Sequence, residues 1–246
     1  MRRVLGYAGA FVALLAGWEL VALAVDSPAL PAPGPALASF ASEVPALAPH
    51  FAVSAWRVLA AVALGVALGA PLGLLLGRSP RLDAVAAPLV FLTYPIPKVV
   101  FLPVLLVLLG LGDSSKIALI TLIVSFQILV TARDASRAVP PASVLSVRSL
   151  GATRAQVFRH VIVPATLPEV FTALRIGAGT AVAVLFLAES IAGTNGLGYY
   201  IVDAWSRIDY EGMFAGIIAM ALLGVLLYEG LDAAEGRSCR WTRAAR

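Results

Sequence analysis

Few side chains in this sequence could do acid–base or ligand chemistry, and they lie scattered among long apolar stretches. The acids Glu19 and Glu189 and the base Lys98 each lie inside or at the end of such a stretch. The two histidines, His50 and His160, fall on opposite sides of the membrane in the topology predicted below. We therefore expect no Ser-His-acid set, no metal site and no catalytic residue in this chain.

Lys98 is the base in the most unusual setting, because prolines surround it. Pro95, Pro97 and Pro103 interrupt an apolar stretch, and Tyr94 stands beside them. A lone lysine at membrane depth costs roughly 2.5–3.5 kcal/mol, so Lys98 should face protein, water or the interface. Two interpretations stay open: a broken helix that lines a cavity, or a lysine that reaches the interface while the prolines shape packing.

Glu189 is the second residue of interest, at the outer end of a predicted span. It is either an interfacial acid hydrogen-bonded to a neighbouring helix or a residue of an outer gate or cavity. Glu19 is interpreted as interfacial. The candidates for a translocation path or gate are Tyr94, Pro95, Lys98 and Glu189.

Nucleotide chemistry is not expected in this chain. No G-x-x-x-x-G-K-[ST] phosphate-binding loop is present. The glycine-rich segment 193–198 follows a predicted span and lacks a strand–helix–strand setting, which favours a turn or outer gate over a dinucleotide site. This chain should therefore hydrolyse no ATP and hold no cofactor.

Composition indicates that the elements carrying these residues lie in a bilayer. Of the 246 residues, 60% are hydrophobic and 13% are charged, against about 25% charged in a soluble domain, and the mean hydropathy is +0.93. The net charge is +4, but the arginines lie at the ends of apolar blocks and form no aromatic-rich stripe, so nucleic acid is not an expected partner. The single cysteine, Cys239, excludes an intrachain disulfide.

Six stretches are apolar enough for transmembrane helices of about 20 residues. The first could instead be a signal peptide, but it is longer than the usual 7–15 apolar residues of such peptides. Lys and Arg gather in alternate loops, which predicts that both termini are cytoplasmic. Gly65, Gly69, Gly73 and Gly77 share one face of the second stretch and predict a packing seam, with a flexible gate element as the alternative. The predicted spans are 4–25, 53–77, 86–110, 115–132, 166–190 and 212–231.

The cytoplasmic segment between the fourth and fifth spans is predicted to be ordered. Residues 142–150 and 154–162 are expected to form two short amphipathic helices, joined at Gly151. Glycine suits a left-handed helix end, Thr153 can cap the second helix, and Pro164 is expected to begin the return to the membrane. An ordered basic and apolar surface of this kind favours binding to a partner.

This segment resembles the shared cytoplasmic loop of bacterial ABC-importer permeases, whose pattern is EAA, three residues, Gly, nine residues, Ile, any residue, Leu-Pro. Gly151 and Pro164 match identically, and Val161 and Val163 are conservative replacements. Leu145 stands where the family has an acid. The resemblance assigns a loop at 140–164 that couples to the ATPase, through Leu145, Arg148, Ser149, Leu150, Gly151, Ala152, Thr153, Val161 and Pro164.

Further stretches extend the resemblance along nearly the whole chain, toward the aliphatic sulfonate, taurine and nitrate branch. It implies an all-α polytopic protein with a permease core at 53–235, after an N-terminal helix and Pro-rich outer segment at 1–52 and before a basic tail at 236–246. It also implies a homodimer in the bacterial plasma membrane, two cytoplasmic ATPase subunits that hold ATP and Mg, and an extracytoplasmic solute-binding protein. The alternative is an ion-gradient-driven secondary transporter or channel, which should show intramembrane carboxylates or inverted repeats.

Overall fold

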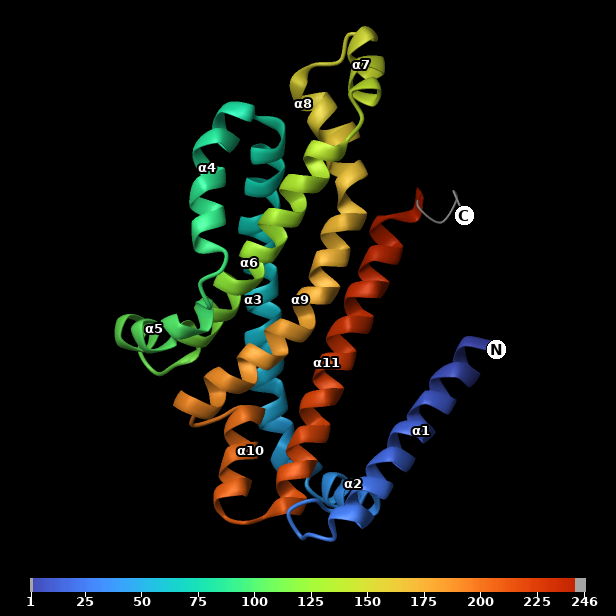
Figure 1. Ribbon diagram of the computed structural model, residues 1–246, viewed down its shortest axis with the longest axis vertical. Coiled ribbons are helices and arrows are strands. Elements are labelled where there is room, and N and C mark those ends of the chain that lie inside the picture. Colours follow the sequence, from blue (N-terminus) through green and yellow to red (C-terminus); the bar gives the residue numbers. More distant parts are fainter. Residues whose placement is uncertain (1, 242–246) are drawn as a thin grey trace. The chain divides into compact units, whose positions relative to one another are not determined.

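The computed structural model describes the backbone of residues 2–241 and the side chains of residues 9–241, and every regular element within that range is helical. The chain divides into two compact units: Met1–Ser54 with Glu189–Leu222, and Ala55–Ala188 with Leu223–Arg246. Three long helices contribute residues to both units, namely α3 (Val44–Arg78), α9 (Val163–Ala192) and α11 (Tyr210–Ser238). All-helical architecture confirms the predicted fold class (Figure 1).

The first unit contains α1 (Arg2–Val25), α2 (Pro33–Ser42), α10 (Leu197–Ser206) and the adjoining parts of the long helices. Trp18 ties α1 into this unit, because its indole N–H donates to the carbonyl of Pro31 at 3.0 Å and its ring stacks on Phe214 at 5.4 Å between centroids. Much of α1 remains exposed and apolar, with Leu14 66% and Leu20 68% exposed. Such a surface suits contact with lipid.

In the second unit, α3 packs against α6 (Asp113–Ala138) along the predicted glycine seam. A Cβ atom added to Gly69 would lie 2.5 Å from the carbonyl oxygen of Ser125, and one added to Gly77 would lie 2.8 Å from the Cβ of Ser136. The hydroxyl of Ser136 donates to the carbonyl of Leu74 at 3.1 Å, across the same two helices. The packing-seam interpretation is therefore confirmed: small residues let the two backbones approach closely.

The predicted third span is broken. Helix α4 (Pro80–Thr93) is followed by a short 3₁₀ turn, η1 (Lys98–Phe101), and by α5 (Leu102–Leu109), with a bend of 84° between the two arms. Pro95 and Pro97 have no backbone N–H to continue the ladder of α4, which accounts for the end of this helix. Leu102 at the start of α5 joins a buried cluster with Leu119 of α6 and with Ala188 of α9.

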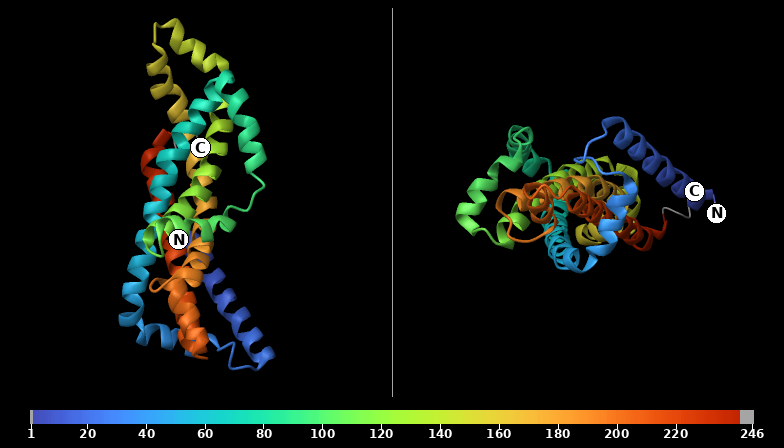
Figure 2. Two further views of the ribbon diagram at one scale, coloured as in Figure 1. Left: turned by 90° about the vertical axis from the view of Figure 1, so that its left-hand side faces the viewer. Right: turned by 90° about the horizontal axis from the view of Figure 1, so that it is seen from below.

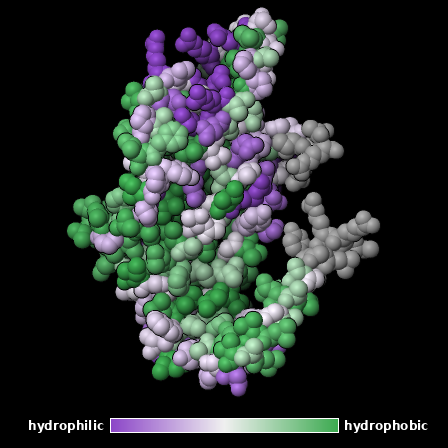
Figure 3. Space-filling model, in the orientation of Figure 1, coloured by the Kyte–Doolittle hydropathy of each residue, from purple (hydrophilic) through white to green (hydrophobic). Residues whose placement is uncertain are grey.

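Among the residues whose side chains the structure describes, four helices are long and apolar enough to cross a bilayer: α3, α6, the helical stretch Arg154–Ala192, and α11. The bent pair of α4 with η1 and α5 would make a fifth. Helix α1 has 24 residues, about 36 Å at 1.5 Å per residue, which is long enough for the hydrocarbon core of a bilayer. Hydrophilic residues gather where α3 and α6 end and α4 begins, whereas the flank covered by α5 is hydrophobic (Figure 3).

Two segments that the sequence placed outside the membrane contain more helix than the sequence indicated. The Pro-rich segment contains α2 and the first turns of α3, and the loop after α9 contains α10. Prolines allow this because Pro33 begins α2 and Pro45 is the second residue of α3. At those first-turn positions, a missing N–H costs no intrahelical hydrogen bond.

Candidate functional site

The loop between α6 and α9 forms an ordered arm at one end of the second unit, and we call residues 140–164 the arm. Helix α7 (Pro141–Ser149) and α8 (Arg154–Val157) project beyond the ends of α6 and α9 (Figures 1 and 2). Both segments lie where the sequence placed its two short helices. The arm is therefore structured, as predicted.

Gly151 ends α7 in a left-handed conformation, with φ +87°. Its N–H donates to the carbonyl of Arg148 at 2.9 Å, and the N–H of Ala152 donates to the carbonyl of Val147 at 3.4 Å. This pair of bonds is the Schellman arrangement, which requires a residue tolerant of positive φ at the position of Gly151. The predicted role of Gly151 in the backbone is confirmed.

Thr153 starts α8 with a complete capping box. Its hydroxyl accepts from the N–H of Gln156 at 3.3 Å, while the side chain of Gln156 accepts from the N–H of Thr153 at 2.8 Å. Both ends of the short connection between α7 and α8 are therefore held by hydrogen bonds. The capping predicted for Thr153 is confirmed.

The second short helix does not end before Pro164, and this part of the prediction is wrong. Helix α8 continues through a π-helical turn, η2 (Phe158–Ile162), directly into α9, which begins at Val163. Pro164 lies in the first turn of α9 and lacks the N–H of a regular i→i−4 bond, so the wider π turn precedes it. The arm thus shares one continuous helical axis with a membrane helix.

The surface of α7 is apolar and basic. Leu145 is 63% exposed and Leu150 is 87% exposed, and Arg148 is also exposed. Between Asp134 and Glu169 the sequence contains no acid and four arginines. A groove of about 540 Å³ lies at the base of the arm, between the end of α6 and the start of α9, where Thr131, Asp134 and Glu169 are among its lining residues.

Lys98 lies at the break between α4 and α5. Its Nζ atom donates to the carbonyls of Thr93 and Tyr94, each at 3.1 Å, and of Ile96 at 3.4 Å. The same atom lies 4.4 Å from the centroid of the Phe126 ring on α6. A cation at the carboxyl end of a helix satisfies carbonyls that have lost their helical donors. In this conformation Lys98 caps α4, while Tyr94 is 52% exposed and Pro95 is exposed.

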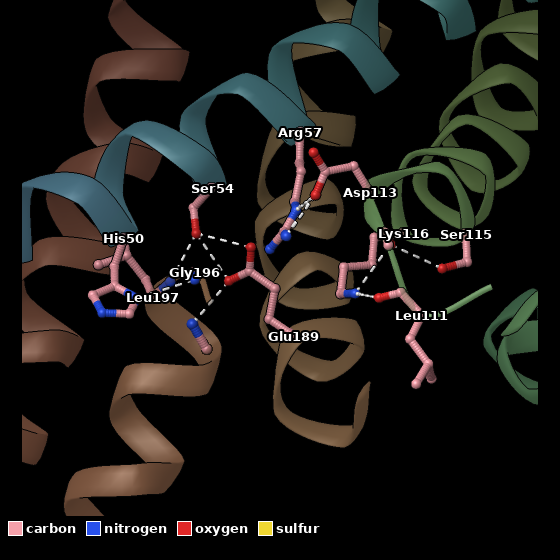
Figure 4. Close-up of polar contacts among 12 residues, drawn as sticks. His50, Ser54, Arg57, Leu111, Asp113, Ser115, Lys116, Glu189, Gly196 and Leu197 are labelled. Atoms are coloured by element: carbon pink, nitrogen blue, oxygen red, sulfur yellow. Dashed lines mark hydrogen bonds and ion pairs between the residues drawn. The ribbon is translucent and has the colours of Figure 1, made fainter. Parts of the chain in front are cut away.

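Glu189, in the first unit, is fully buried. It belongs to a cluster at the turn before α10, which we call the capped turn, where three consecutive backbone N–H groups each donate to a side chain from another helix. Figure 4 shows His50, Ser54 and Glu189 converging on this turn. The distances are 3.1 Å from Gly196 N to His50 Nδ1, 2.8 Å from Leu197 N to Ser54 Oγ, and 2.9 Å from Gly198 N to Glu189 Oε2.

The capped turn explains the glycines at 193–198. Gly196 has φ +102°, and a Cβ atom there would lie 2.6 Å from Glu189 Oε2. Ser54 also donates to both carboxylate oxygens of Glu189 at 2.9 Å. This segment is a turn, as expected, and the first N–H groups of α10, which no helical carbonyl can reach, are bound by side chains.

Sequence reasoning missed the ionic partners of several arginines of the second unit. Arg57 is 1% exposed and binds Asp113 at 2.6 Å, although it lies in an apolar stretch. Arg133 pairs with Asp83 of α4. Arg175 of α9 contacts two acids of α11, pairing with Asp232 at 3.2 Å and with Glu235, so it anchors its helix. The arginines were visible in the sequence, but nothing there indicated their distant partners.

Taken together, apolar spans, a glycine seam and an ordered arm at a polar end define a polytopic α-helical membrane subunit. The chain belongs to the family of binding-protein-dependent transport system inner membrane components, whose model matches residues 65–235. It is the permease subunit of an ABC importer, as the resemblance implied.

Curated relatives support this assignment. The chain is 36% identical over 192 residues to the taurine transport system permease protein TauC of Escherichia coli (strain K12), covering 78% of this chain and 70% of that protein. It is 29% identical to the putative aliphatic sulfonates transport permease protein SsuC of Bacillus subtilis (strain 168), with the same coverage. It is 30% identical to the formylaminopyrimidine transport permease protein ThiX of Halalkalibacterium halodurans, covering 75% and 76%.

A solved structure shares the fold. The inward-facing MetNI methionine ABC transporter contains a chain that matches this one with a TM-score of 0.66 at 20% identity, over 80% of this chain and 98% of that one. At this identity the likeness establishes the fold alone.

Proposed function

We propose that two copies of this chain form the membrane path of an importer, on two cytoplasmic ATPase subunits that bind ATP and Mg, fed by an extracytoplasmic solute-binding protein. The observation that carries the proposal is the arm. Leu145 and Leu150 are largely exposed on it, beside arginines. An ordered apolar surface at a polar end of the protein calls for a protein partner.

The construction of the arm supports a mechanical role. The Schellman bonds at Gly151 and the capping box at Thr153 fix α7 against α8, and α8 runs into α9 without a break. A displacement of α7 by an ATPase would therefore reach a membrane helix instead of being lost in a flexible loop. The contact with the ATPase would involve the surface around Leu145, Arg148 and Leu150.

For orientation, we propose that the arm and both termini are cytoplasmic and that the capped turn is external. The Lys and Arg distribution supports this assignment, since positive residues favour cytoplasmic loops. Six spans follow if α1 and the bent pair each cross the bacterial plasma membrane. The bent pair then brings Tyr94, Pro95 and Lys98 to membrane depth as candidate residues of the solute path.

The proposed solute is a small anion of the sulfonate or nitrate kind, or another small organic nutrient. Relatives named for taurine and for aliphatic sulfonates favour an anion, and one named for formylaminopyrimidine extends the range to other organic solutes. Lys98 would supply positive charge near such a path. Glu189 would hold the outer turn from a buried position.

Native mass spectrometry of the tagged chain, extracted from membranes in mild detergent, tests the assembly. We expect one complex that contains two copies of this 25.5 kDa chain and two copies of an ATPase. ATP hydrolysis should be found with the complex and should be absent from this chain once the ATPase has been removed. An ATP-hydrolysing preparation of this chain alone, or uptake driven by an ion gradient without any ATPase, would contradict the proposal.

A further inference from the structure

Two caps of the capped turn, His50 and Glu189, are ionisable, and His50 is the one that loses its hydrogen-bond acceptor on protonation. Gly196 N lies 3.1 Å from His50 Nδ1, and accepting this N–H requires an imidazole that carries its hydrogen on Nε2 alone. Histidine is the side chain whose charge commonly changes between about pH 5 and 8. The hydroxyl of Ser54, which accepts the next N–H, has no such dependence.

We propose that His50 is a pH-sensitive latch that holds the turn at Gly196 closed while its ring is neutral and releases it on protonation. A proton on Nδ1 would point at the Gly196 N–H, so a hydrogen bond would be replaced by two opposed donors. The buried N–H of Gly196 would then have to find water. Acidification therefore opens the turn, and neutral pH closes it.

The groups around His50 decide which partner moves. The rings of Tyr199 and Tyr200, from α10, lie 6.0 and 5.6 Å from the imidazole centroid, and the carboxylate of Glu189, from α9, lies directly behind Gly196. Aromatic faces and a carboxylate both attract a cationic ring. They would hold a protonated His50 in place, so the glycine turn is the part that is displaced.

Opening would expose a specific part of the protein. The backbone of 196–198 is buried, while Thr194 and Asn195 at the tip of the turn are already exposed. Release of Gly196 would uncap α10, whose first N–H groups rely on the three side chains. In the proposed topology, this turn faces the exterior, so it would respond to external pH.

Hydrogen–deuterium exchange on the full chain in lipid nanodiscs tests the latch directly and needs no transport activity. Exchange of the segment 196–200 is measured at about pH 7.5 and about pH 5.5 and corrected for the intrinsic effect of pH on exchange. Three variants accompany the wild type. His50→Asn keeps an acceptor near the Nδ1 position but cannot titrate, His50→Phe keeps an aromatic ring without an acceptor, and His160→Asn removes the other histidine of the chain.

We expect corrected exchange at 196–200 to rise about tenfold on acidification in the wild type and in His160→Asn. It should stay slow at both pH values in His50→Asn and be fast at both in His50→Phe. If His50→Asn does not fold, the wild type and His50→Phe still decide the matter. The proposal would be overturned if the corrected exchange of 196–200 in the wild type did not change with pH. It would also be overturned if this segment were as protected in His50→Phe as in the wild type.

Discussion

Lys98 illustrates how one side chain can stabilise a broken membrane helix. Pro97 cannot donate a backbone hydrogen bond to the carbonyl of Thr93, which accepts the N–H of Ile96 at 3.2 Å and Lys98 Nζ at 3.1 Å. The same ammonium group also binds the carbonyls of Tyr94 and Ile96. Hydrogen bonds to charged groups contribute about 1.5–3 kcal/mol each at best, enough to offset the cost of a lysine at the membrane depth that the proposed topology gives Lys98.

We predict that Lys98→Met loosens the break while Lys98→Arg preserves it. Methionine matches the length of the side chain but leaves three carbonyls without their shared donor, whereas guanidinium can still bind them. Deuterium exchange of residues 93–98 should therefore rise in Lys98→Met, and the free energy of unfolding should fall by about 1–3 kcal/mol. Equal exchange in the two variants would show that Lys98 does not cap α4.

The sequence alone indicated the roles of some single residues but not of others, such as His50. His50 was assigned no role, because its partner Gly196 lies 146 positions away and is a backbone group. Gly151 was easier to interpret, since a glycine between two amphipathic segments indicates a left-handed helix end. Leu145 departs from the acid of the family pattern, and its 63% exposure fits a contact with a partner that relies on apolar surface.

At the scale of elements, the α3–α6 seam follows directly from spacing. Glycines four apart lie on one helix face, and a Cβ atom on Gly73 would meet the Cβ of Ala132 at 2.8 Å as well as backbone of α6. Carbonyl oxygens of a helix cannot move aside as a flexible side chain can. The two helices would therefore have to separate to accommodate a larger residue.

We predict that Gly73→Ala destabilises the protein although alanine favours helices. The higher helix propensity of alanine stabilises α3 by about 1 kcal/mol. Overpacking against α6 typically costs about 1–3 kcal/mol, and more when backbone is displaced. Gly179→Ala on α9 is the matched control, because nothing lies within 4 Å of the position its Cβ would occupy. The thermal unfolding temperature in detergent should fall for Gly73→Ala and not for Gly179→Ala. A Gly73→Ala protein that unfolds at or above the wild-type temperature would refute the seam.

Hydrophobic pattern predicted the long helices well, because each predicted span outside the break lies inside one observed helix: α1, α3, α6, α9 and α11. It predicted the connections poorly. Helices α2 and α10 contain too few residues for a clear apolar period. The prolines at the start of α2 and the glycine before α10 resembled loop signals. The continuity of α8 with α9 depends on a π turn, which leaves no mark in residue type. The side-chain networks could not be predicted from the sequence, because they join residues that are far apart along the chain.

At the scale of the molecule, orientation decides which surfaces meet which partners. The native thiol interferes little with labelling, because Cys239 is buried, and burial together with the charge of Glu235 raises its pKa. A raised pKa leaves less reactive thiolate near neutral pH. Single cysteines can therefore be placed at exposed serines in a Cys239→Ser background.

We predict that a membrane-impermeant maleimide labels Ser42→Cys in intact cells and labels Ser149→Cys only after the cells are opened. Ser42 ends α2 in the proposed external segment, and Ser149 ends α7 in the proposed cytoplasmic arm. Both replacements are conservative and both positions are exposed. The reverse pattern would invert the topology and place the arm away from any cytoplasmic ATPase.

In the proposed importer, the arm transmits ATPase movement to the membrane helices, and Gly151 is its most sensitive position. A β-branched residue at φ +87° costs about 1–2 kcal/mol or re-aims α7, although no neighbouring atom would clash with its Cβ. Gly110, with φ +79° and equally open space, ends α5 outside the arm and supplies the matched control.

The deciding measurement is solute uptake per ATP hydrolysed, in proteoliposomes that contain the complete importer with wild-type, Gly151→Val or Gly110→Val chain. We expect Gly151→Val to insert normally but either to lose the ATPase or to hydrolyse ATP with uptake reduced at least about tenfold. Gly110→Val, whose backbone at φ +79° and ψ 178° is also one that essentially only glycine adopts, should keep the wild-type ratio. Normal assembly and a normal ratio in Gly151→Val would contradict the proposed coupling through the arm.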